Sequence, residues 1–352
     1  MEQEKQEFLE LIDRPAFLVR DGIVYACNQR AKNRQIAEGV TISQLLGVNT
    51  DAYEAFQGGV LYLTPDLGYG HCGATVTRQV SGDLFLLDRD SDSEQLQALA
   101  LAAQQLRIPL SNIVNTSDQL FTELDDAGQQ DKAAHIRRGL FQLMRIIGNM
   151  ADADRYSNSE LSKMENTELG IFLQEIFAKA NAHLEGVGLQ LDFTRPKTPV
   201  YTQIDRERME RAVMNLISNA AKFADGNHIT AKLTCNGKHA ALSLENEGNQ
   251  IPGHVQSSLF QRYMREPAIE DSRFGLGLGF TLVRSVVAAH GGTILVDQPK
   301  GIRVTMTIAI QKNPGSMLRT PNLWIGDYAG GLDRILLELS DCLPADAYLT
   351  DL

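Results

Sequence analysis

The stretch Phe274-Gly275-Leu276-Gly277-Leu278-Gly279-Phe280 places a glycine at every second position, directly before an apolar helical segment that ends at His290-Gly291-Gly292. Glycine has no side chain to keep a ligand away from the backbone, and the amino end of a helix attracts anions. The pattern is therefore typical of a turn that binds phosphate. Because alternating glycines also occur in ordinary turns, the prediction depends on the sequence that surrounds it.

Three earlier blocks stand in order before this turn. The first contains Asn215 and Asn219, which are four residues apart and therefore neighbours on one helix face, with Lys222 one turn further. Amide oxygens there can hold a hydrated Mg²⁺, and a lysine beside them can meet phosphate oxygens. The first block alone could be plain helix surface, but four blocks in this order and spacing predict a nucleotide site. They are Asn215–Phe223 with its apolar stripe Met209, Val213, Leu216, Ile217 and Ala220, then Glu245–Pro252, Leu259–Arg265 and Phe274–Phe280.

Together the blocks resemble the N, G1, F and G2 boxes of the ATP-binding domain of sensor histidine kinases, over roughly residues 166–310. The resemblance implies an α/β sandwich with ATP and Mg²⁺ as its ligands, and it makes Asn219 the Mg²⁺ ligand. By the same resemblance, the residues on the phosphate side would be Asn215, Asn219, Lys222, Gly275, Gly277 and Gly279.

The loop that should read adenine departs from the family's DxGxG pattern. Asn246 stands at the aspartate position, where its carbonyl oxygen can still accept a hydrogen bond from the adenine amine. Gly248 keeps the first glycine, but Gln250 replaces the second and adds a side chain where the family has none. The sequence therefore predicts nucleotide binding through Asn246 and Gly248. If Gln250 fills the site instead, the alternative is a dimeric scaffold with a dead nucleotide pocket.

A different pattern, in which apolar positions recur every three or four residues, begins near Ser93 and returns after a break at Ala127-Gly128. It is typical of a heptad seam. Two such helices form an antiparallel hairpin that cannot hide its seam alone, so residues 93–157 are expected to form a homodimer as a four-helix bundle. A coiled-coil spacer without chemistry is the alternative. The seam consists of Leu96, Leu99, Ala103, Leu106, Leu110, Ile113, Ser117, Leu120 and Leu124, and then Ala133, Ile136, Leu140, Leu143, Ile147 and Met150.

Within the first seam helix, residues 104–110 (QQLRIPL) resemble the H-E-L-R-T-P-L box of the family's phosphotransfer hairpin, which accounts for a proline inside a helix. Gln104 and Gln105 stand where the family has the phosphoacceptor histidine and its adjacent acid. A primary amide is neither a useful nucleophile nor a useful base near neutral pH. Ile108 has no polar atom where a Thr or Asn typically supports dephosphorylation of the partner. The box is therefore degenerate, and no catalytic residue is predicted.

Bulk properties exclude other classes of protein. The 352 residues are 43% hydrophobic and carry a formal charge of −11 without a Lys/Arg-rich run, which argues against nucleic acid as a partner. No apolar stretch approaches the ~20 residues of a membrane span, and the acidic start carries no signal peptide, so a cytoplasmic protein is expected. The 4 distant cysteines form no CxxC pair, which favours isolated thiols.

The segments outside the nucleotide blocks complete an α+β multidomain fold. Pro15–Ala31 resembles the start of a PAS sensor domain, with a hairpin signal at Asp21-Gly22 and a helix cap at Asn28. Near the C-terminus, Leu332–Leu343 is amphipathic and is expected to dock on a domain surface. The expected domains are a PAS-like α/β sensor at 1–92, a dimerisation hairpin at 93–160, an α/β-sandwich ATPase domain of the histidine kinase type at 161–312, and a tail at 313–352.

These features favour an ATP-binding signalling pseudokinase, with PAS-like input and output by contact with a response regulator or another signalling protein. The rival hypothesis is an active histidine kinase that uses a partner or a non-standard residue as phosphoacceptor. His135 on the second seam helix was considered for that role, and a solvated surface histidine is the better interpretation.

Overall fold

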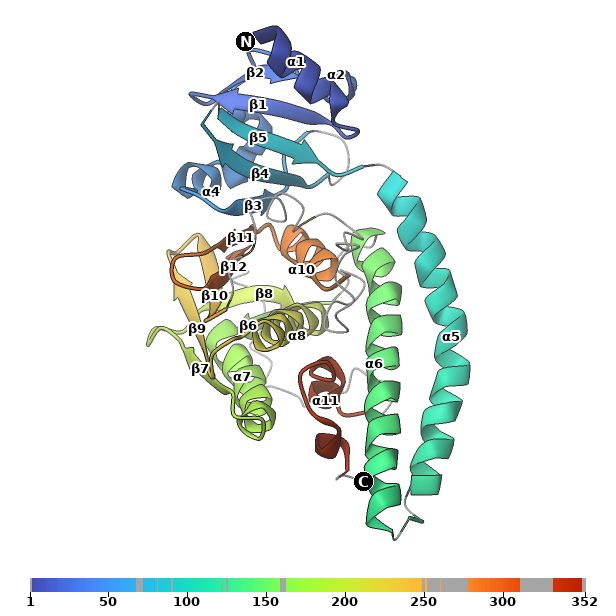
Figure 1. Ribbon diagram of the computed structural model, residues 1–352. Coiled ribbons are helices and arrows are strands. Elements are labelled where there is room, and N and C mark those ends of the chain that lie inside the picture. The colour runs from blue at the N-terminus through green and yellow to red at the C-terminus, as the bar shows by residue number, and fades with distance from the viewer. Residues whose placement is uncertain are drawn as a thin grey trace.

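The computed structural model describes residues 2–67, 72–80, 82–89, 91–121, 123–124, 126–158, 163–248, 251, 260, 278–310 and 332–349. An N-terminal module lies at one end, and a long helical hairpin runs along one side of the molecule (Figure 1). An α/β domain packs beside the hairpin, and the C-terminal segment lies between the two. Among these residues, no helix combines the length and apolar character needed to cross a membrane.

The N-terminal module (residues 2–89) contains an antiparallel sheet with the strand order β2-β1-β5-β4-β3. Asp21 and Gly22 join β1 to β2 with φ of 51° and 74°, as the predicted two-residue hairpin requires. Asn28 caps α2 as predicted, because its side chain accepts a hydrogen bond from the Ala31 N–H at 2.9 Å. The elements are α1 (Glu2–Leu11), β1 (Ala16–Arg20), β2 (Ile23–Cys27), α2 (Gln29–Asn33), α3 (Ile42–Leu46), η1 (Gly47–Asn49), α4 (Thr50–Ala55), β3 (Val60–Leu63), β4 (Ala74–Gln79) and β5 (Gly82–Leu87).

The hairpin consists of α5 (Ser91–Phe121) and α6 (Ala127–Asn158), with Pro109 inside α5. The predicted break at Ala127-Gly128 is wrong by a few residues, because α6 already begins at Ala127. The cause is Asp126, whose carboxylate accepts a hydrogen bond from the Gln129 N–H at 3.0 Å. This contact caps α6, so that the helix can start at Ala127. The seam divides between two faces. Ala103, Leu110, Ala133, Leu140 and Ile147 are buried, whereas Leu106, Ile113, Leu120, Ile136 and Leu143 are exposed in the single chain.

The α/β domain (residues 163–310) contains a mixed sheet with the order β11-β12-β10-β9-β7, in which only the pair β7–β9 is parallel among the described strands. Helices α8 and α10 lie between this sheet and α6 (Figure 1). A single buried core joins the sheet, its helices, the hairpin and the C-terminal segment. The elements are β6 (Met164–Glu168), α7 (Leu169–Glu185), β7 (Gln190–Thr194), β8 (Tyr201–Asp205), α8 (Arg206–Lys222), β9 (His228–Cys235), β10 (His239–Asn246), α10 (Leu278–Ala289), β11 (Ile294–Asp297) and β12 (Ile302–Ala309).

The N-terminal module is joined to the α/β domain through its sheet, which the sequence analysis did not predict. Strand β3 pairs antiparallel with β11, with Tyr62 opposite Ile294, so that one sheet of ten strands runs through both units. Arg284 on α10 reinforces the junction. Its guanidinium lies 4.3 Å from the centre of the Tyr62 ring and forms an ion pair with Asp88, the first residue after β5. The N-terminal module therefore contacts α10.

The C-terminal segment (residues 332–349) contains α11 (Arg334–Glu338) and η2 (Ala345–Tyr348). It packs on α6, α7 and α8. Tyr348 packs edge-on against Phe141 of α6, with ring centres 5.1 Å apart. The apolar residues expected to dock are buried or partly buried, and these are Leu332, Ile335, Leu336, Leu339 and Leu343.

Candidate nucleotide site

Helix α8, which carries the predicted phosphate-side residues, begins at a fixed point. Asp205 caps it by accepting a hydrogen bond from the Arg208 N–H at 3.2 Å. The Asp205 N–H in turn donates to Nε2 of His290 at 3.0 Å, and Nδ1 of His290 donates to the Val286 carbonyl at 2.7 Å. Burial lowers the pKa of His290, so the neutral ring is favoured. His290 is structural, because it ties the start of α8 to the end of α10.

The structure brings three of the predicted residues together where α8 faces the start of α10. A Cβ added to Gly279 would lie 2.9 Å from Oδ1 of Asn215 and 3.9 Å from Nδ2 of Asn219. Even an alanine at 279 would therefore crowd the Asn215 amide and would contact that of Asn219. Asn215 donates from Nδ2 to the Arg211 carbonyl at 2.9 Å, while its buried Oδ1 has no hydrogen-bond partner among the described residues. A buried amide oxygen without a partner is costly, which suits a position that a ligand or its water completes.

Asn246 and Gly248 lie together at the end of β10, beside the end of α8. Nδ2 of Asn246 donates to the Phe223 carbonyl at 3.1 Å. Since that carbonyl can only accept, the amide nitrogen must face it, which leaves the side-chain oxygen as the acceptor for a ligand. A Cβ on Gly248 would lie 2.4 Å from the same Phe223 oxygen. A glycine is thus required at 248, because the backbone there lies too close to the Phe223 carbonyl to leave room for a side chain.

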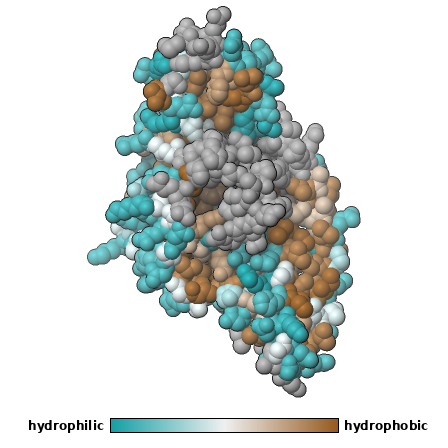
Figure 2. Space-filling model, viewed as in Figure 1, coloured by the Kyte–Doolittle hydropathy of each residue, from teal (hydrophilic) through white to brown (hydrophobic). Residues whose placement is uncertain are grey.

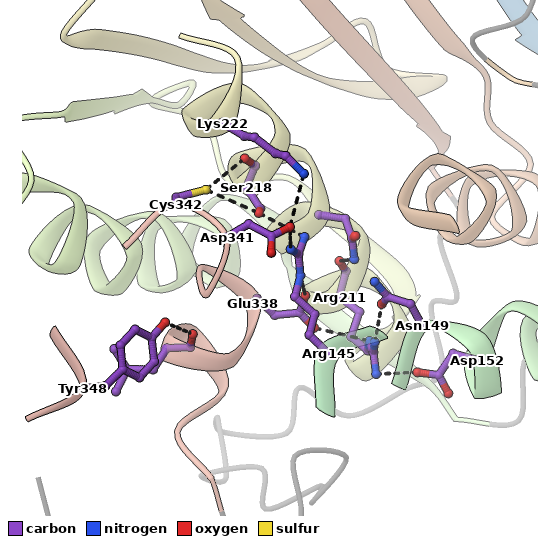
Figure 3. A network of polar contacts seen from close by, with 12 residues as sticks. Arg145, Asn149, Asp152, Arg211, Ser218, Lys222, Glu338, Asp341, Cys342 and Tyr348 are labelled. Carbon is purple, nitrogen blue, oxygen red and sulfur yellow. Dashed lines mark hydrogen bonds and ion pairs between the residues drawn. The ribbon is translucent and has the colours of Figure 1, made fainter. Parts of the chain in front are cut away.

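Lys222 lies one turn beyond Asn219 but does not project into solvent. Its ammonium donates to Oδ2 of Asp341 at 3.3 Å, and only 7% of the side chain is exposed (Figure 3). Asp341 comes from the C-terminal segment, which the sequence analysis expected to dock without assigning it a target. The lysine predicted to meet phosphate therefore has a carboxylate of the same chain as its partner.

A buried network of charges surrounds this contact and links three parts of the chain (Figure 3). Arg145 of α6 binds Asp341 at 2.6 Å and Glu338 at 3.4 Å, and it donates to Ser218 at 3.0 Å. On the other side of Glu338, Arg211 of α8 lies 3.7 Å from its carboxylate. Arg211 also forms an ion pair with Asp152 at 2.5 Å and donates a hydrogen bond to the side-chain oxygen of Asn149 at 2.8 Å. No short motif marks these residues, so they could not be found from sequence patterns.

The degenerate box lies on the outer helix of the hairpin. Gln104, Gln105 and Ile108 are exposed on α5, which lies on the far side of α6 from the α/β domain (Figure 1). His135 is exposed on α6, consistent with a solvated surface residue. Gly275 and Gly277, predicted to lie on the phosphate side, fall outside the described residues, and so does Gln250 of the adenine loop.

The fold and the geometry around α8 define a class of nucleotide-binding domain, and comparisons with known proteins agree. Residues 204–312 match the family described as histidine kinase-, DNA gyrase B- and HSP90-like ATPases. This part of the chain is a histidine kinase-type ATP-binding domain, and its homologues include sensor histidine kinases.

Individual relatives match over more of the chain. The sensor protein KdpD of Escherichia coli is 26% identical over 226 residues, which cover 61% of this chain and 25% of KdpD. The probable sensor histidine kinase TcrY of Mycobacterium tuberculosis is 27% identical over 245 residues, which cover 67% of this chain and 50% of TcrY. This chain thus spans no more than half the length of either. The crystal structure of full-length ShkA in complex with AMPPNP has a TM-score of 0.51 at 18% identity, and the match covers 62% of this chain and 47% of ShkA. This last likeness concerns the fold alone.

Proposed function

We propose that this chain is an ATP-binding signalling pseudokinase, in which nucleotide occupancy of the α/β domain sets a conformation and the output is contact with another protein. The observation that carries the proposal is a combination. The side chains of a nucleotide site converge around Asn215 and Gly279, while the position of the phosphoacceptor holds Gln104.

The residues present fit a nucleotide with Mg²⁺. The oxygen of Asn246 is left as an acceptor for the adenine amine, and Asn215 offers beside Gly279 a buried oxygen that has no hydrogen-bond partner within the described part of the chain. Asn219 is the residue we assign to the metal, which prefers oxygen ligands and keeps several waters. When bound, Mg-ATP would supply an electrophilic phosphoryl group. The chain's own contribution is to bind and orient it, since Gln104 has no nitrogen lone pair free to attack.

The hairpin supports a homodimer through residues 93–157. Alternate seam positions such as Leu106 and Ile113 are about half exposed in the single chain, at 51% and 52%. Figure 2 shows hydrophobic residues gathered along the hairpin side of the molecule. A second copy would bury this row in a four-helix bundle, which is the arrangement that a heptad seam favours. The strand order β2-β1-β5-β4-β3 supports a PAS-like sensor as the input module.

Two measurements on the purified full-length protein test the pseudokinase. Calorimetry with Mg-ADP should show saturable binding that Asn219→Ala abolishes or greatly weakens. Incubation with γ-labelled ATP should give no labelled protein. Gln104→His should restore little, because Gln105 still cannot accept a proton, and general-base help is typically worth about 10²–10⁴ in rate. The pair Gln104→His with Gln105→Glu should outperform the single change.

The outcomes separate the rival hypotheses. An acid-labile phosphoramidate on the unmodified protein would establish an active histidine kinase, and mapping it to His135 would show that the acceptor had moved to α6. Absence of any saturable binding at millimolar Mg-ADP or Mg-ATP would leave a dimeric scaffold with a dead nucleotide pocket. In that case Gln250→Gly would show whether the added side chain is what blocks the site.

A further inference from the structure

The C-terminal segment reaches the phosphate side of the proposed nucleotide site. One carboxylate oxygen of Asp341 lies 3.3 Å from the Lys222 ammonium and 2.6 Å from the Arg145 guanidinium. The same turn places the partly buried Cys342 against Ser218, whose carbonyl lies 3.3 Å from the Cys342 sulfur. Lys222 is thereby held inside the molecule by an acidic residue more than a hundred positions later in the sequence.

Helix geometry places Lys222 at the boundary between two surfaces of α8. With about 100° of rotation per residue, Asn219 lies about 40° to one side of Asn215. On the other side lie Lys222 at about 20°, Arg211 at about 40° and Ser218 at about 60°. Gly279 covers the Asn215 and Asn219 edge, and the C-terminal segment covers the Ser218 and Arg211 edge. Lys222 lies between them, within reach of either.

We infer that the C-terminal segment is a nucleotide-sensitive clamp, in which Asp341 and the nucleotide phosphates compete for Lys222. This inference rests on the proposed function of the α8 site. Phosphate binding turns the Lys222 ammonium toward Asn219 and away from Asp341, and Asp341 then carries an excess negative charge close to the phosphates. Like charges repel, so the segment loosens from α8 as the nucleotide binds.

The rest of the network makes the clamp a bridge between domains. Glu338 faces Arg145 of α6 and Arg211 of α8, so the closed segment holds the hairpin against the α/β domain. Loosening the segment removes its carboxylates from these two arginines. Nucleotide occupancy is thereby converted into a change at the hairpin surface without any transfer of phosphate. Coupling between two equilibria is reciprocal. If nucleotide binding favours the open segment by a given factor, opening the segment must raise the nucleotide affinity by that factor.

Calorimetry of Mg-ADP binding to the full-length protein tests the affinity side of this coupling. Asp341→Asn keeps the shape of the residue and removes its charge, and it should lower the Kd for Mg-ADP by about five-fold or more, as for typical allosteric coupling. Asp346→Asn is the matched control, because Asp346 is an exposed carboxylate on η2 of the same segment. It should change the Kd by less than about two-fold. In a Lys222→Met background, Asp341→Asn should no longer improve binding.

The reverse side of the coupling is read at Cys342. Saturating Mg-ADP should speed the alkylation of Cys342, which is measured by peptide mass spectrometry. Cys27, buried in the N-terminal module, should react at an unchanged rate. Binding of Mg-ADP with the same Kd in the wild type and Asp341→Asn, and no change at Cys342, would overturn the clamp but not the nucleotide site. A weaker Kd in Asp341→Asn would also overturn it, because Asp341 would then assist the ligand. No binding to any variant would instead refute the proposed function.

Discussion

Glu338 is the most deeply buried charge of the clamp, and neutralising it gives a quantitative test of the network. Its carboxylate has no exposed surface and lies between Arg145 at 3.4 Å and Arg211 at 3.7 Å. With an effective dielectric constant of about 20, each of these attractions amounts to about 5 kcal/mol before the cost of removing the charges from water. That cost offsets much of the attraction, so the net effect of losing the carboxylate is smaller.

Glu338→Gln keeps the shape of the side chain and removes the charge. Breaking a buried ion pair typically costs about 3–5 kcal/mol. Here Arg145 keeps Asp341 and Arg211 keeps Asp152, so neither guanidinium is left without a carboxylate. We therefore expect the lower end of the range, about 3 kcal/mol, which corresponds to about a hundred-fold increase in local opening.

Peptide-resolved hydrogen exchange on the full-length protein measures this opening where it occurs. Amides of α11 and of the adjoining turn should exchange about a hundred-fold faster in Glu338→Gln than in the wild type. Glu185→Gln is the control, because Glu185 is exposed on α7, where its carboxylate accepts a hydrogen bond from Nδ2 of Asn181 at 2.6 Å. Its exchange pattern should match the wild type. Unchanged protection of α11 in Glu338→Gln would show that the apolar contacts alone hold the segment, and the electrostatic account would be wrong.

Three further perturbations address the site, the dimer and the pH response. Gly248→Ala should lower the free energy of unfolding by about 1–3 kcal/mol, because its Cβ would lie 2.4 Å from the Phe223 oxygen. Gly58→Ala is the control, because the space around Gly58 is open and the change should be neutral. Equal melting temperatures for the two variants would contradict the close approach at Gly248. Leu106→Glu should leave the circular dichroism unchanged but produce monomers in sedimentation, and a wild type that is already monomeric at tens of micromolar would count against the bundle. Burial lowers the pKa of His290 below its ordinary 6.5, so the unfolded chain takes up the proton first and the free energy of unfolding should decrease as the pH drops below 6.5. Urea titrations should show this decrease in the wild type, and the part due to the ring should be absent in His290→Gln.

Local patterns predicted the elements that local physics determines. The turn at Asp21-Gly22 and the cap at Asn28 each depend on a backbone requirement that a few neighbouring residues reveal. The stripe of α8 is buried as its spacing predicted, and Asn215 lies against Gly279, as the order of the blocks implied.

Contacts between distant segments could not be predicted in this way. Glu338 and Asp341 belong to an amphipathic stretch whose leucines indicate only that it docks somewhere. Their partners, Arg145 and Arg211, lie on two other helices and share no motif with them. The pairing of β3 with β11 also leaves no pattern in the sequence, because an edge strand offers the same backbone groups to any partner. Sequence periodicity specifies which face of an element is buried, but not which distant element covers it.

The location of these unpredicted contacts bears on the proposal that the protein signals without phosphotransfer. Arg284 of α10 binds Asp88 of the N-terminal module, five residues beyond Gly279 at the nucleotide site. Arg211 of α8 binds Asp152 of the hairpin, one turn before Asn215. Both helices that frame the nucleotide site therefore also hold another part of the chain. Under the proposed function, a shift of either helix on nucleotide binding would strain these ion pairs. Nucleotide occupancy would then be coupled to the N-terminal module and to the hairpin through packing, with no phosphate transfer to the position that Gln104 holds.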